Sequence, residues 1–477
     1  MKIKDIIPKV QELFTQSFDV VVREFKIAGT KKAVLFYIDT IAGGSRISVE
    51  IIAPLTRLQP LPKGNIVTVA TQELVNICRF QMVETFAEAV KELLNGKTLF
   101  IIDGEKDFVI LDTTQFQMRG IAEPPTNSVV LGPREGFIES AVANIGLLRK
   151  RVKHPDLTIV NNVVGKYTNT NVSVMYIKSI ADKKIVDAVI KKIKDIQIDG
   201  ILDSFYVMQY LQKERFNIFN QVGSSEKPDV VASKLLEGRV AILVDGSPIV
   251  LTVPYMLIED IQAADDYYTN STIVSLRRFI RLFGGIFAVV LPGLYLSIQL
   301  YHYNIMPLNA LFFITNATEN TPFTPMIELI IILVLFEIMY EAALRMPRHL
   351  GAATSLVAAV VLGGTAIQAG MLSGPAVLVA ALSLMAMYIL PNLAPQISLL
   401  RFVFIILGGI LGIYGLLLGG ILLAIHLCNL ESFATPMMAP FAPNIESDQK
   451  DALFLKDLPS RKTRPRGIPS KNKTRAG

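Results

Sequence analysis

The sequence contains no tryptophan, two cysteines and four histidines among its 477 residues. Cys78 and Cys428 stand in unrelated surroundings and form no short-spacing motif, so neither a disulfide framework nor a cysteine-based metal site is predicted. The histidines are too scattered to form a metal cluster, and the chain has no HExxH pattern. These absences disfavour redox and zinc chemistry, and we expect neither a cofactor nor a metal site.

Charge is also scarce in part of the chain. Charged residues make up 18% of the sequence and hydrophobic residues 51%, whereas soluble domains average about 25% charged residues. The deficit is local, because Arg401 is the only formally charged residue from His349 to Leu430. A water-facing surface of that length would need many charges. Before about residue 279 the charges are dense and mixed, so the two parts of the chain are predicted to face different solvents.

The second part is predicted to be a helical membrane domain of four to five spans over residues 279–430. Leu282–Tyr301 and Phe402–Leu427 are the most apolar segments, and about 20 residues at about 1.5 Å each cross a bilayer core of about 30 Å. Three weaker segments are expected to be helices packed against protein: Met326–Leu344, Gly351–Leu372 and Ala376–Leu390. Small residues in this region would let helix backbones approach closely.

Basic residues predict the orientation of this domain. Arg277, Arg278 and Arg281 lie directly before the first span, and no lysine or arginine follows until Arg345. Because basic residues favour the cytoplasmic side of a membrane, the N-terminal part is predicted to be cytoplasmic and the 302–325 loop to lie outside.

The sequence leaves the side of the C-terminus open. Residues 431–477 are expected to form a C-terminal motif and a basic, disordered tail. Five complete spans would place this tail outside, but residues 446–477 carry nine lysines and arginines against four acidic residues, which favours the cytoplasm and an even number of spans. A re-entrant segment, at Met326–Leu344 or at Phe433–Pro443, would reconcile the two counts.

The first part is predicted to be a duplicated α+β unit. The segments 93–111, LLNGKTLFIIDGEKDFVIL, and 235–251, LLEGRVAILVDGSPIVL, both read Leu-Leu-x-Gly-basic, then an apolar run, Asp-Gly and a second apolar run. Asp-Gly between β-rich stretches is typical of a hairpin turn. A Tyr-Ile pair precedes both segments at nearly the same offset. We therefore expect related subdomains at residues 1–120 and 130–255.

The sequence contains no recognisable catalytic constellation. Gly96-Lys97-Thr98 lacks the earlier glycine of a phosphate-binding loop and precedes a strand pattern, so it is interpreted as a turn. Neighbouring motifs supply no Ser/His/Asp set and no paired carboxylates, and we expect no enzyme activity. The acidic pair Asp265-Asp266 lies just before the first span. It could bind a cation, but we favour a solvated turn beside the membrane.

Ionisable and polar residues inside the predicted spans are the candidate functional residues, because a charge at membrane depth costs at least about 2.5–3.5 kcal/mol and usually faces protein or water. Glu337, Glu341 and Arg345 are spaced four apart on one helical face, where Glu341 and Arg345 could pair. Glu328 projects to the opposite side, and Gln368 lies in a glycine-rich segment. These residues would either line a pore or subunit contact or form a structural ion pair, and the sequence leaves both interpretations open.

Five segments resemble the A subunit of the GerA-type spore germinant receptors. The first two are GPREGFIESAVANIGLLRKRVKHPDL, from Gly132, and SEKPDVVASKLLEGRVAILVDGSPIVLTVP, from Ser225. The others are DDYY, MPRHLG and ESFATPMMAPFAP, which begin at residues 265, 346 and 431. The family's last motif usually reads Ser-Phe-Gly-x-Pro-Tyr, but this chain has Ala434 and Met437 in place of the glycine and the tyrosine.

The resemblance implies a protein of the spore inner membrane, in contact with lipid, that works with a transporter-like B subunit and a lipoprotein C subunit. It also implies that copies of the chain form a ring whose membrane half conducts ions once the B subunit has sensed a nutrient. Two alternatives stay open, an A-like subunit of an accessory ion-release channel and a non-conducting membrane scaffold. A self-sufficient transporter is disfavoured, because the spans are few and show no inverted repeat. The near-neutral first part lacks the basic footprint of a nucleic-acid-binding protein, so no nucleic acid partner is expected.

Overall fold

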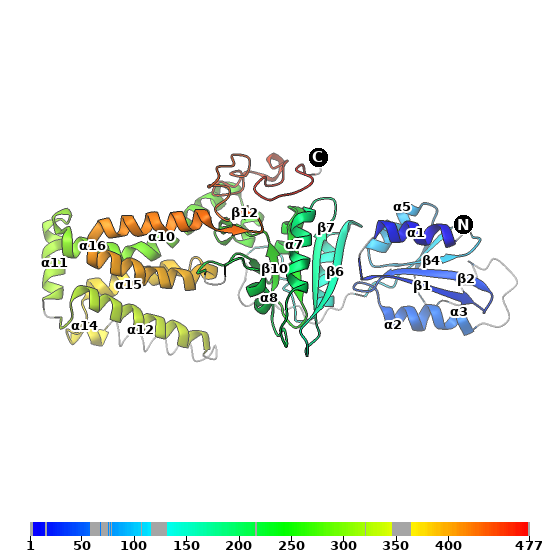
Figure 1. Ribbon diagram of the computed structural model, residues 1–477, viewed down its shortest axis with the longest axis horizontal. Coiled ribbons are helices and arrows are strands. Elements are labelled where there is room, and N and C mark those ends of the chain that lie inside the picture. The colour runs from blue at the N-terminus through cyan, green and yellow to red at the C-terminus, as the bar shows by residue number, and fades with distance from the viewer. Residues whose placement is uncertain are drawn as a thin grey trace.

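The computed structural model describes residues 3–14, 17–57, 67, 75, 77, 79–105, 107–115, 131–214, 217–319, 321–345 and 364–475. Three parts follow one another along its longest axis: a first α+β subdomain, a second α+β subdomain and a helical half (Figure 1). The C-terminal segment returns from the helical half to the second subdomain (Figure 1).

The first subdomain contains, within its described residues, a five-stranded antiparallel sheet in the order β1-β2-β4-β5-β3. Its strands are β1 (Val20–Ile27), β2 (Lys31–Ile38), β3 (Phe80–Val83), β4 (Thr98–Ile102) and β5 (Phe108–Leu111). One face is covered by α1 (Ile3–Leu13) and α5 (Phe86–Leu94), and the other by the continuous run of α2 (Gly44–Arg46), the π-helix η1 (Ile47–Ile52) and α3 (Ala53–Arg57). The central strand β4 is therefore buried throughout.

The second subdomain repeats this order, β6-β7-β9-β10-β8, in its described residues. Its strands are β6 (Leu157–Val164), β7 (Thr170–Ile177), β8 (Gly223–Ser225), β9 (Val240–Val244) and β10 (Val250–Val253). One face is covered by α6 (Ala141–Arg151) and α9 (Pro228–Leu236), and the other by α7 (Lys183–Lys194) and α8 (Ser204–Leu211). The Asp-Gly dipeptides close equivalent hairpins, with φ of 89° at Gly104 and 91° at Gly246. The duplicated α+β fold is confirmed.

A buried ion pair joins the two subdomains. Arg149 of α6 donates from Nε and Nη2 to the two carboxylate oxygens of Asp19, each at 2.8 Å. Both side chains are buried. The backbones also approach closely, because a Cβ on Gly146 would lie 2.7 Å from the carbonyl oxygen of Thr40. A bidentate guanidinium–carboxylate pair has a fixed geometry, so it orients one subdomain on the other.

The helical half follows a connector of two 3-10 helices, η3 (Leu257–Asp260) and η4 (Ala264–Tyr268). Its elements are α10 (Ser271–Tyr301), η5 (Tyr303–Ile305), α11 (Leu308–Thr318), α12 (Pro325–Arg345), α14 (Ala366–Gln368), α15 (Gly374–Met387), η7 (Pro391–Leu393) and α16 (Ala394–Asn429). The segment expected as the 302–325 loop contains η5 and α11.

Among the described residues, two helices are long and apolar enough to cross a membrane, Ser271–Tyr301 and Pro391–Asn429. They contain the two segments that the sequence marks as most apolar. Of the three weaker segments, Met326–Leu344 corresponds to α12 and Ala376–Leu390 overlaps α15. Most of Gly351–Leu372 lies outside the described residues.

The long helix α16 is interrupted at Gly412. This residue has φ 63° and ψ −147°, a conformation that only glycine adopts readily. Beyond it the chain folds back, because a Cβ on Gly415 would lie 2.3 Å from the carbonyl oxygen of Leu407. The expected continuous span Phe402–Leu427 is therefore a helical hairpin whose two halves run side by side (Figure 1).

The helical half has two ends, which we call near and far by their distance from the second subdomain. The starts of α10 and α16 lie at the near end. The end of α10 and the turn at Gly412 lie at the far end, where a Cβ on Gly412 would be 3.2 Å from Tyr301 Cδ2. α10 crosses α16 closely, since a Cβ on Gly408 would be 2.4 Å from the carbonyl oxygen of Gly293.

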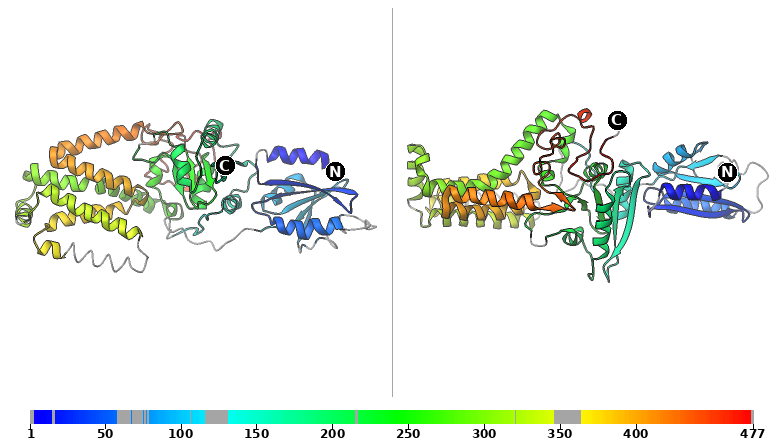
Figure 2. Two further views of the ribbon diagram at one scale, coloured as in Figure 1. Left: turned by 60° about the horizontal axis from the view of Figure 1, so that its bottom comes forward. Right: turned by 45° about the horizontal axis from the view of Figure 1, so that its top comes forward.

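The C-terminal segment, residues 431–475, is folded in the structure, which corrects the expectation of a disordered tail. It contains β11 (Glu431–Ser432), β12 (Thr435–Pro436) and the 3-10 helix η8 (Leu458–Ser460). Ile468 is completely buried, and the backbone of Lys471 donates to the carbonyl oxygen of Ile180 at 2.8 Å. Apolar residues within the basic segment give it a surface to bury against the second subdomain and the connector (Figure 2).

Candidate functional site

The helical half contains a buried ion pair that joins several helices. Arg401 of α16 is fully buried, and its Nη2 lies 3.3 Å from Oε2 of Glu337 in α12. The same carboxylate oxygen accepts a hydrogen bond of 2.7 Å from Ser398. Arg401 Nη1 lies 3.4 Å from the hydroxyl of Ser383 in α15, which itself donates to the carbonyl oxygen of Ala288 in α10 at 2.6 Å. The pair thus contacts α12, α15, α16 and, through Ser383, α10.

The predicted membrane-depth residues do not form one stripe. Glu337 belongs to the pair with Arg401. Glu328 is buried near the far end, where its carboxylate accepts from the backbone N–H of Ser373. Glu341 and Arg345 form the anticipated pair, but both side chains are exposed, and Gln368 is exposed as well. The structure therefore separates two buried carboxylates from an exposed ion pair.

Arg401 is the residue that the sequence analysis noted without assigning a role. Its signal was present, because a single charge within a long apolar stretch has to find a partner at membrane depth. Its partner was not readable, since Glu337 lies on another helix and the spacing between them carries no periodic signal.

At the near end, the juxtamembrane residues form a second ion cluster. Asp266 is completely buried and accepts hydrogen bonds from Arg278 Nε at 2.9 Å and from Arg281 Nη1 at 2.8 Å. Burial raises the pKa of Asp266, but the hydrogen bonds from Arg281 and Arg278 outweigh it and leave the pKa below its usual value. The favoured interpretation of a solvated acidic turn is therefore wrong for Asp266, although Asp265 is partly exposed. Arg277 is exposed and takes no part in the cluster.

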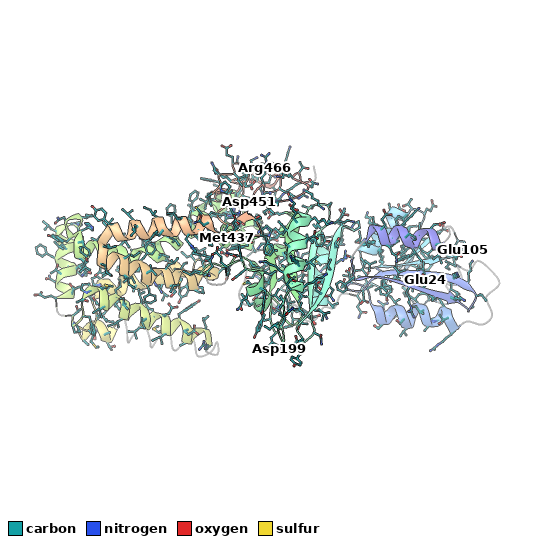
Figure 3. The ribbon with its side chains drawn as sticks, in the orientation of Figure 1. Glu24, Glu105, Asp199, Met437, Asp451 and Arg466 are labelled. Atoms are coloured by element: carbon teal, nitrogen blue, oxygen red, sulfur yellow. The ribbon has the colours of Figure 1, made fainter. Side chains whose placement is uncertain are left out.

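Asp451, in the C-terminal segment, completes this cluster. Its carboxylate lies 3.1 Å from Arg278 Nη1 and 2.7 Å from Arg461 Nη1, and it accepts a hydrogen bond of 3.2 Å from the hydroxyl of Tyr267. Figure 3 shows Asp451 over the middle of the molecule, well away from Asp199 at the opposite edge of the second subdomain. One carboxylate thus connects the start of α10, the connector and the C-terminal segment.

A cavity of about 590 Å³ lies between the second subdomain and the near end of the helical half. Its walls come from β8, α9, the connector, Arg281 of α10 and residues 389–396 around η7. Charged side chains of both signs line it, including Lys234, Arg239 and Glu259. Lys234 and Arg239 both pair with Glu259, and although burial raises the pKa of Glu259, these cations lower it below its usual value.

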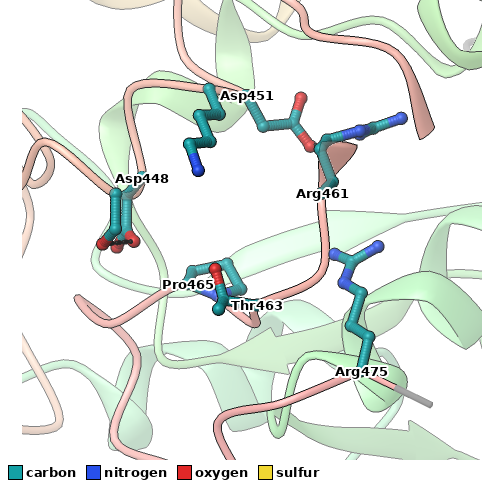
Figure 4. A pocket seen from close by; sticks show the side chains of 8 residues that line it. Asp448, Asp451, Arg461, Thr463, Pro465 and Arg475 are labelled. Atoms are coloured by element: carbon teal, nitrogen blue, oxygen red, sulfur yellow. Dashed lines mark hydrogen bonds and ion pairs between the residues drawn. The ribbon is translucent and has the colours of Figure 1, made fainter. Parts of the chain in front are cut away.

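A second, much smaller pocket of about 30 Å³ lies within the C-terminal segment (Figure 4). Asp448, Asp451, Arg461 and Arg475 are among its lining residues. Asp448 is already engaged, because its carboxylate accepts from the backbone N–H groups of Arg466 and Gly467 at 2.9 and 2.7 Å. This volume suits one or two water molecules.

These arrangements suit electrostatic coupling between elements. The described residues contain no group of three or more side chains able to hold a metal ion. A duplicated α+β region, tied by buried ion pairs to a helical half with two helices able to cross a membrane, defines a membrane-associated protein in which contacts can pass between the two halves.

The family is shown by comparison with known proteins. The model of the Bacillus/Clostridium GerA spore germination protein matches residues 8–467, and the chain belongs to this family. The chain is 35% identical to spore germination protein KA of Bacillus subtilis (strain 168), with 97% of this chain and 86% of that protein covered. It is 34% identical to the uncharacterised membrane protein YfkQ of the same organism, with 91% and 85% covered.

A solved structure is also similar. The crystal structure of the N-terminal domain of the A subunit of the Bacillus megaterium spore germinant receptor GerK3 is 29% identical. It covers 54% of this chain and 96% of that domain, with a TM-score of 0.43. The resemblance to germinant receptor A subunits that the sequence motifs indicated is confirmed by the family match and the relatives.

Proposed function

We propose that the chain is the A subunit of a nutrient germinant receptor in the spore inner membrane and is not an enzyme. In this proposal it assembles with further copies of itself and with B and C subunits, and its helical half conducts ions when the complex senses a nutrient. Membership of the GerA family supports the receptor role. The Glu337–Arg401 pair is the single observation that most favours conduction.

The position of this pair is unusual for a purely structural contact. Arg401 is fully buried, and its Nε has no hydrogen-bond partner among the described residues. The side chain of Glu337 is 36% exposed at the surface of the helical half. A charge at membrane depth is stabilised by protein or water rather than lipid. An adjoining copy or a water-filled path on the Glu337 side would provide that environment.

The surface of the helical half supports assembly or lipid contact. Large apolar side chains are exposed along its helices, among them Leu308, Phe312 and Phe313 of α11 and Leu417, Leu418 and Ile421 of α16. Extended apolar surfaces of this kind mark membrane or protein interaction sites. Both kinds of contact are needed by a subunit that forms a ring in a membrane.

The C-terminal segment supports an even number of membrane crossings. It packs against the second subdomain, so the two ends of the helical half emerge on one side. A cytoplasmic N-terminal part then implies a cytoplasmic C-terminal segment, which is the parity that its basic residues favour. The hairpin turn at Gly412 supplies an additional reversal of the chain at the far end.

The proposal is tested by substituting the pair in the full receptor. Spores carrying Glu337→Gln or Arg401→Gln are expected to change their nutrient-triggered ion release, measured by potassium efflux, while the protein level stays normal by immunoblot. Glu341→Gln is the matched control, because Glu341 lies one turn further along the same helix and is exposed. Unchanged efflux in both variants, with efflux abolished by changes in the α+β half, would support the scaffold alternative.

Assembly is tested separately by mass. The detergent-solubilised complex is expected to contain several copies of the chain. A stable monomer in the presence of its partner subunits contradicts the ring, whatever the efflux measurements show.

A further inference from the structure

The cavity between the second subdomain and the helical half has the size of a ligand site. Its volume is about 590 Å³, within the range of about 300–1,000 Å³ for small-molecule pockets. One wall belongs to α9 of the second subdomain, and the opposite wall includes Gln396 of α16. A molecule bound here would therefore contact both halves of the protein.

Two nearly buried polar side chains in the walls have an atom without a partner. The side chain of Asp229 is 9% exposed, and its Oδ2 accepts from the hydroxyl of Tyr268 at 2.8 Å. Its Oδ1 has no hydrogen-bond partner among the described residues. Gln396 is 7% exposed, and its Oε1 also has none within that part of the chain. A buried polar atom left unpaired costs about 1–3 kcal/mol, which a polar ligand would recover.

The charges of the walls leave acidic groups free. The cations are engaged: Lys234 and Arg239 pair with Glu259, and Arg281 pairs with Asp266. Lys227 donates to the carbonyl oxygen of Pro133 at 2.9 Å and lies 3.7 Å from Asp229.

Two further acids of the walls, Asp260 and Asp265, form no ion pair among the described residues. Asp260 is held instead by the hydroxyl of Tyr255 and by the amide of Asn392, at 3.4 Å. Burial raises the pKa of Asp260 to about 6. The cavity thus has negative charge to offer near neutral pH.

We propose that this cavity binds a small organic amine, with the ammonium group held by Asp229, Asp260 and Asp265 and a second polar group at Gln396. The volume is far larger than a bare metal ion needs. Tyr255, Tyr267, Tyr268 and two phenylalanines also line the cavity, and aromatic rings stabilise alkylammonium groups. Occupancy would link α9 to α16 and so adjust the contact between the two halves. This inference does not depend on ion conduction.

Binding is tested on the full chain in detergent by isothermal titration with putrescine at pH 7. Saturable binding of one putrescine per chain is expected, and Asp229→Asn and Gln396→Met are each expected to weaken it by about tenfold, equivalent to about 1.4 kcal/mol. Asp199→Asn is the control, because Asp199 is an exposed acid of the same subdomain at the edge remote from Asp451 (Figure 3). The affinity is expected to rise between pH 5 and pH 7 as Asp260 ionises.

Competitors and a peripheral variant make the test decisive. Asp265→Asn, at a partly exposed position, is expected to fold normally and to weaken binding even if the buried variants unfold. Absence of saturable binding overturns the proposal, and so does equal binding of succinate, which has two negative charges on a similar chain. Equal displacement of putrescine by calcium or potassium at the same concentration would assign the cavity to inorganic cations and also overturn it.

Discussion

Arg401 is the residue with the greatest energetic demand in the helical half, and its pairing predicts a non-additive result. Arg401→Met leaves Glu337 without its cation and is expected to destabilise the chain by about 2 kcal/mol, below the roughly 3–5 kcal/mol of a fully buried pair, because Glu337 is partly exposed. The double variant with Glu337→Leu is expected to recover much of this loss. Thermal unfolding in detergent measures the effect. Additive losses in the double variant would mean that the two side chains are not coupled.

Asp260 predicts a pH dependence of stability. Its folded pKa, raised by burial from 3.8 to about 6, means that the folded chain holds this proton more tightly than the unfolded chain. The contribution is complete below about pH 4 and is lost as the pH rises through about 6. The Tm of the native chain should therefore fall, relative to that of Asp260→Asn, between pH 4.5 and pH 7. Parallel Tm curves would contradict the raised pKa. Asp266, whose pKa is lowered, has the opposite sign and loses stability only on stronger acidification.

The β11–β12 hairpin explains the family's preference for glycine in its last motif. Ser432 pairs with Thr435, so Phe433 and Ala434 form a two-residue loop with φ of 46° and 62°. Positive φ at both positions is typical of a type I′ turn, which favours glycine. Ala434→Gly is expected to stabilise the chain by up to about 1 kcal/mol, because alanine pays a steric cost in this conformation. A rise in Tm measures it. A lower Tm would mean that the flexibility added to the unfolded chain outweighs the relief.

The turn at Gly412 predicts the sensitivity of α16. Gly412→Ala adds a Cβ at φ 63° and ψ −147°, next to Tyr301 and His302, and is expected to destabilise the hairpin by about 1–3 kcal/mol. Gly420→Ala is the matched control in the same element, because a Cβ there meets nothing within 4 Å. Thermal unfolding of the two variants compares them. Equal behaviour would indicate that α16 does not reverse at Gly412.

At the scale of the whole molecule, the C-terminal segment is held by Asp451. Asp451→Asn weakens the contacts with Arg278 and Arg461 and is expected to release this segment from the second subdomain. Trypsin cleavage after Arg461, followed by mass spectrometry, should then become faster. Glu446→Gln is the control, since Glu446 is exposed in the same segment. Unchanged cleavage would mean that the buried Ile468 and backbone bonds hold the segment alone.

The sequence was informative where periodicity or a local motif carries the signal. The two Asp-Gly turns located equivalent hairpins, and the apolar runs located α10 and α16. The interruption at Gly412 was not predictable, because glycines recur throughout this region and only the packing partner shows which one turns. The tail was misjudged because net charge dominated its composition, while its few apolar residues find their contacts far away in the chain.

The sequence by itself determined that the chain has an α+β repeat and an apolar helical half, and its motifs identified the family, because these properties are written in short-range patterns. Only the tertiary structure decided that Arg401 pairs with Glu337, that Asp266 is buried between Arg278 and Arg281, and that Asp451 connects the C-terminal segment to α10. These pairs join residues from separate elements. Their partners are selected by burial and geometry, since an unpaired charge in the interior is too costly to leave, and no spacing along the chain encodes that choice.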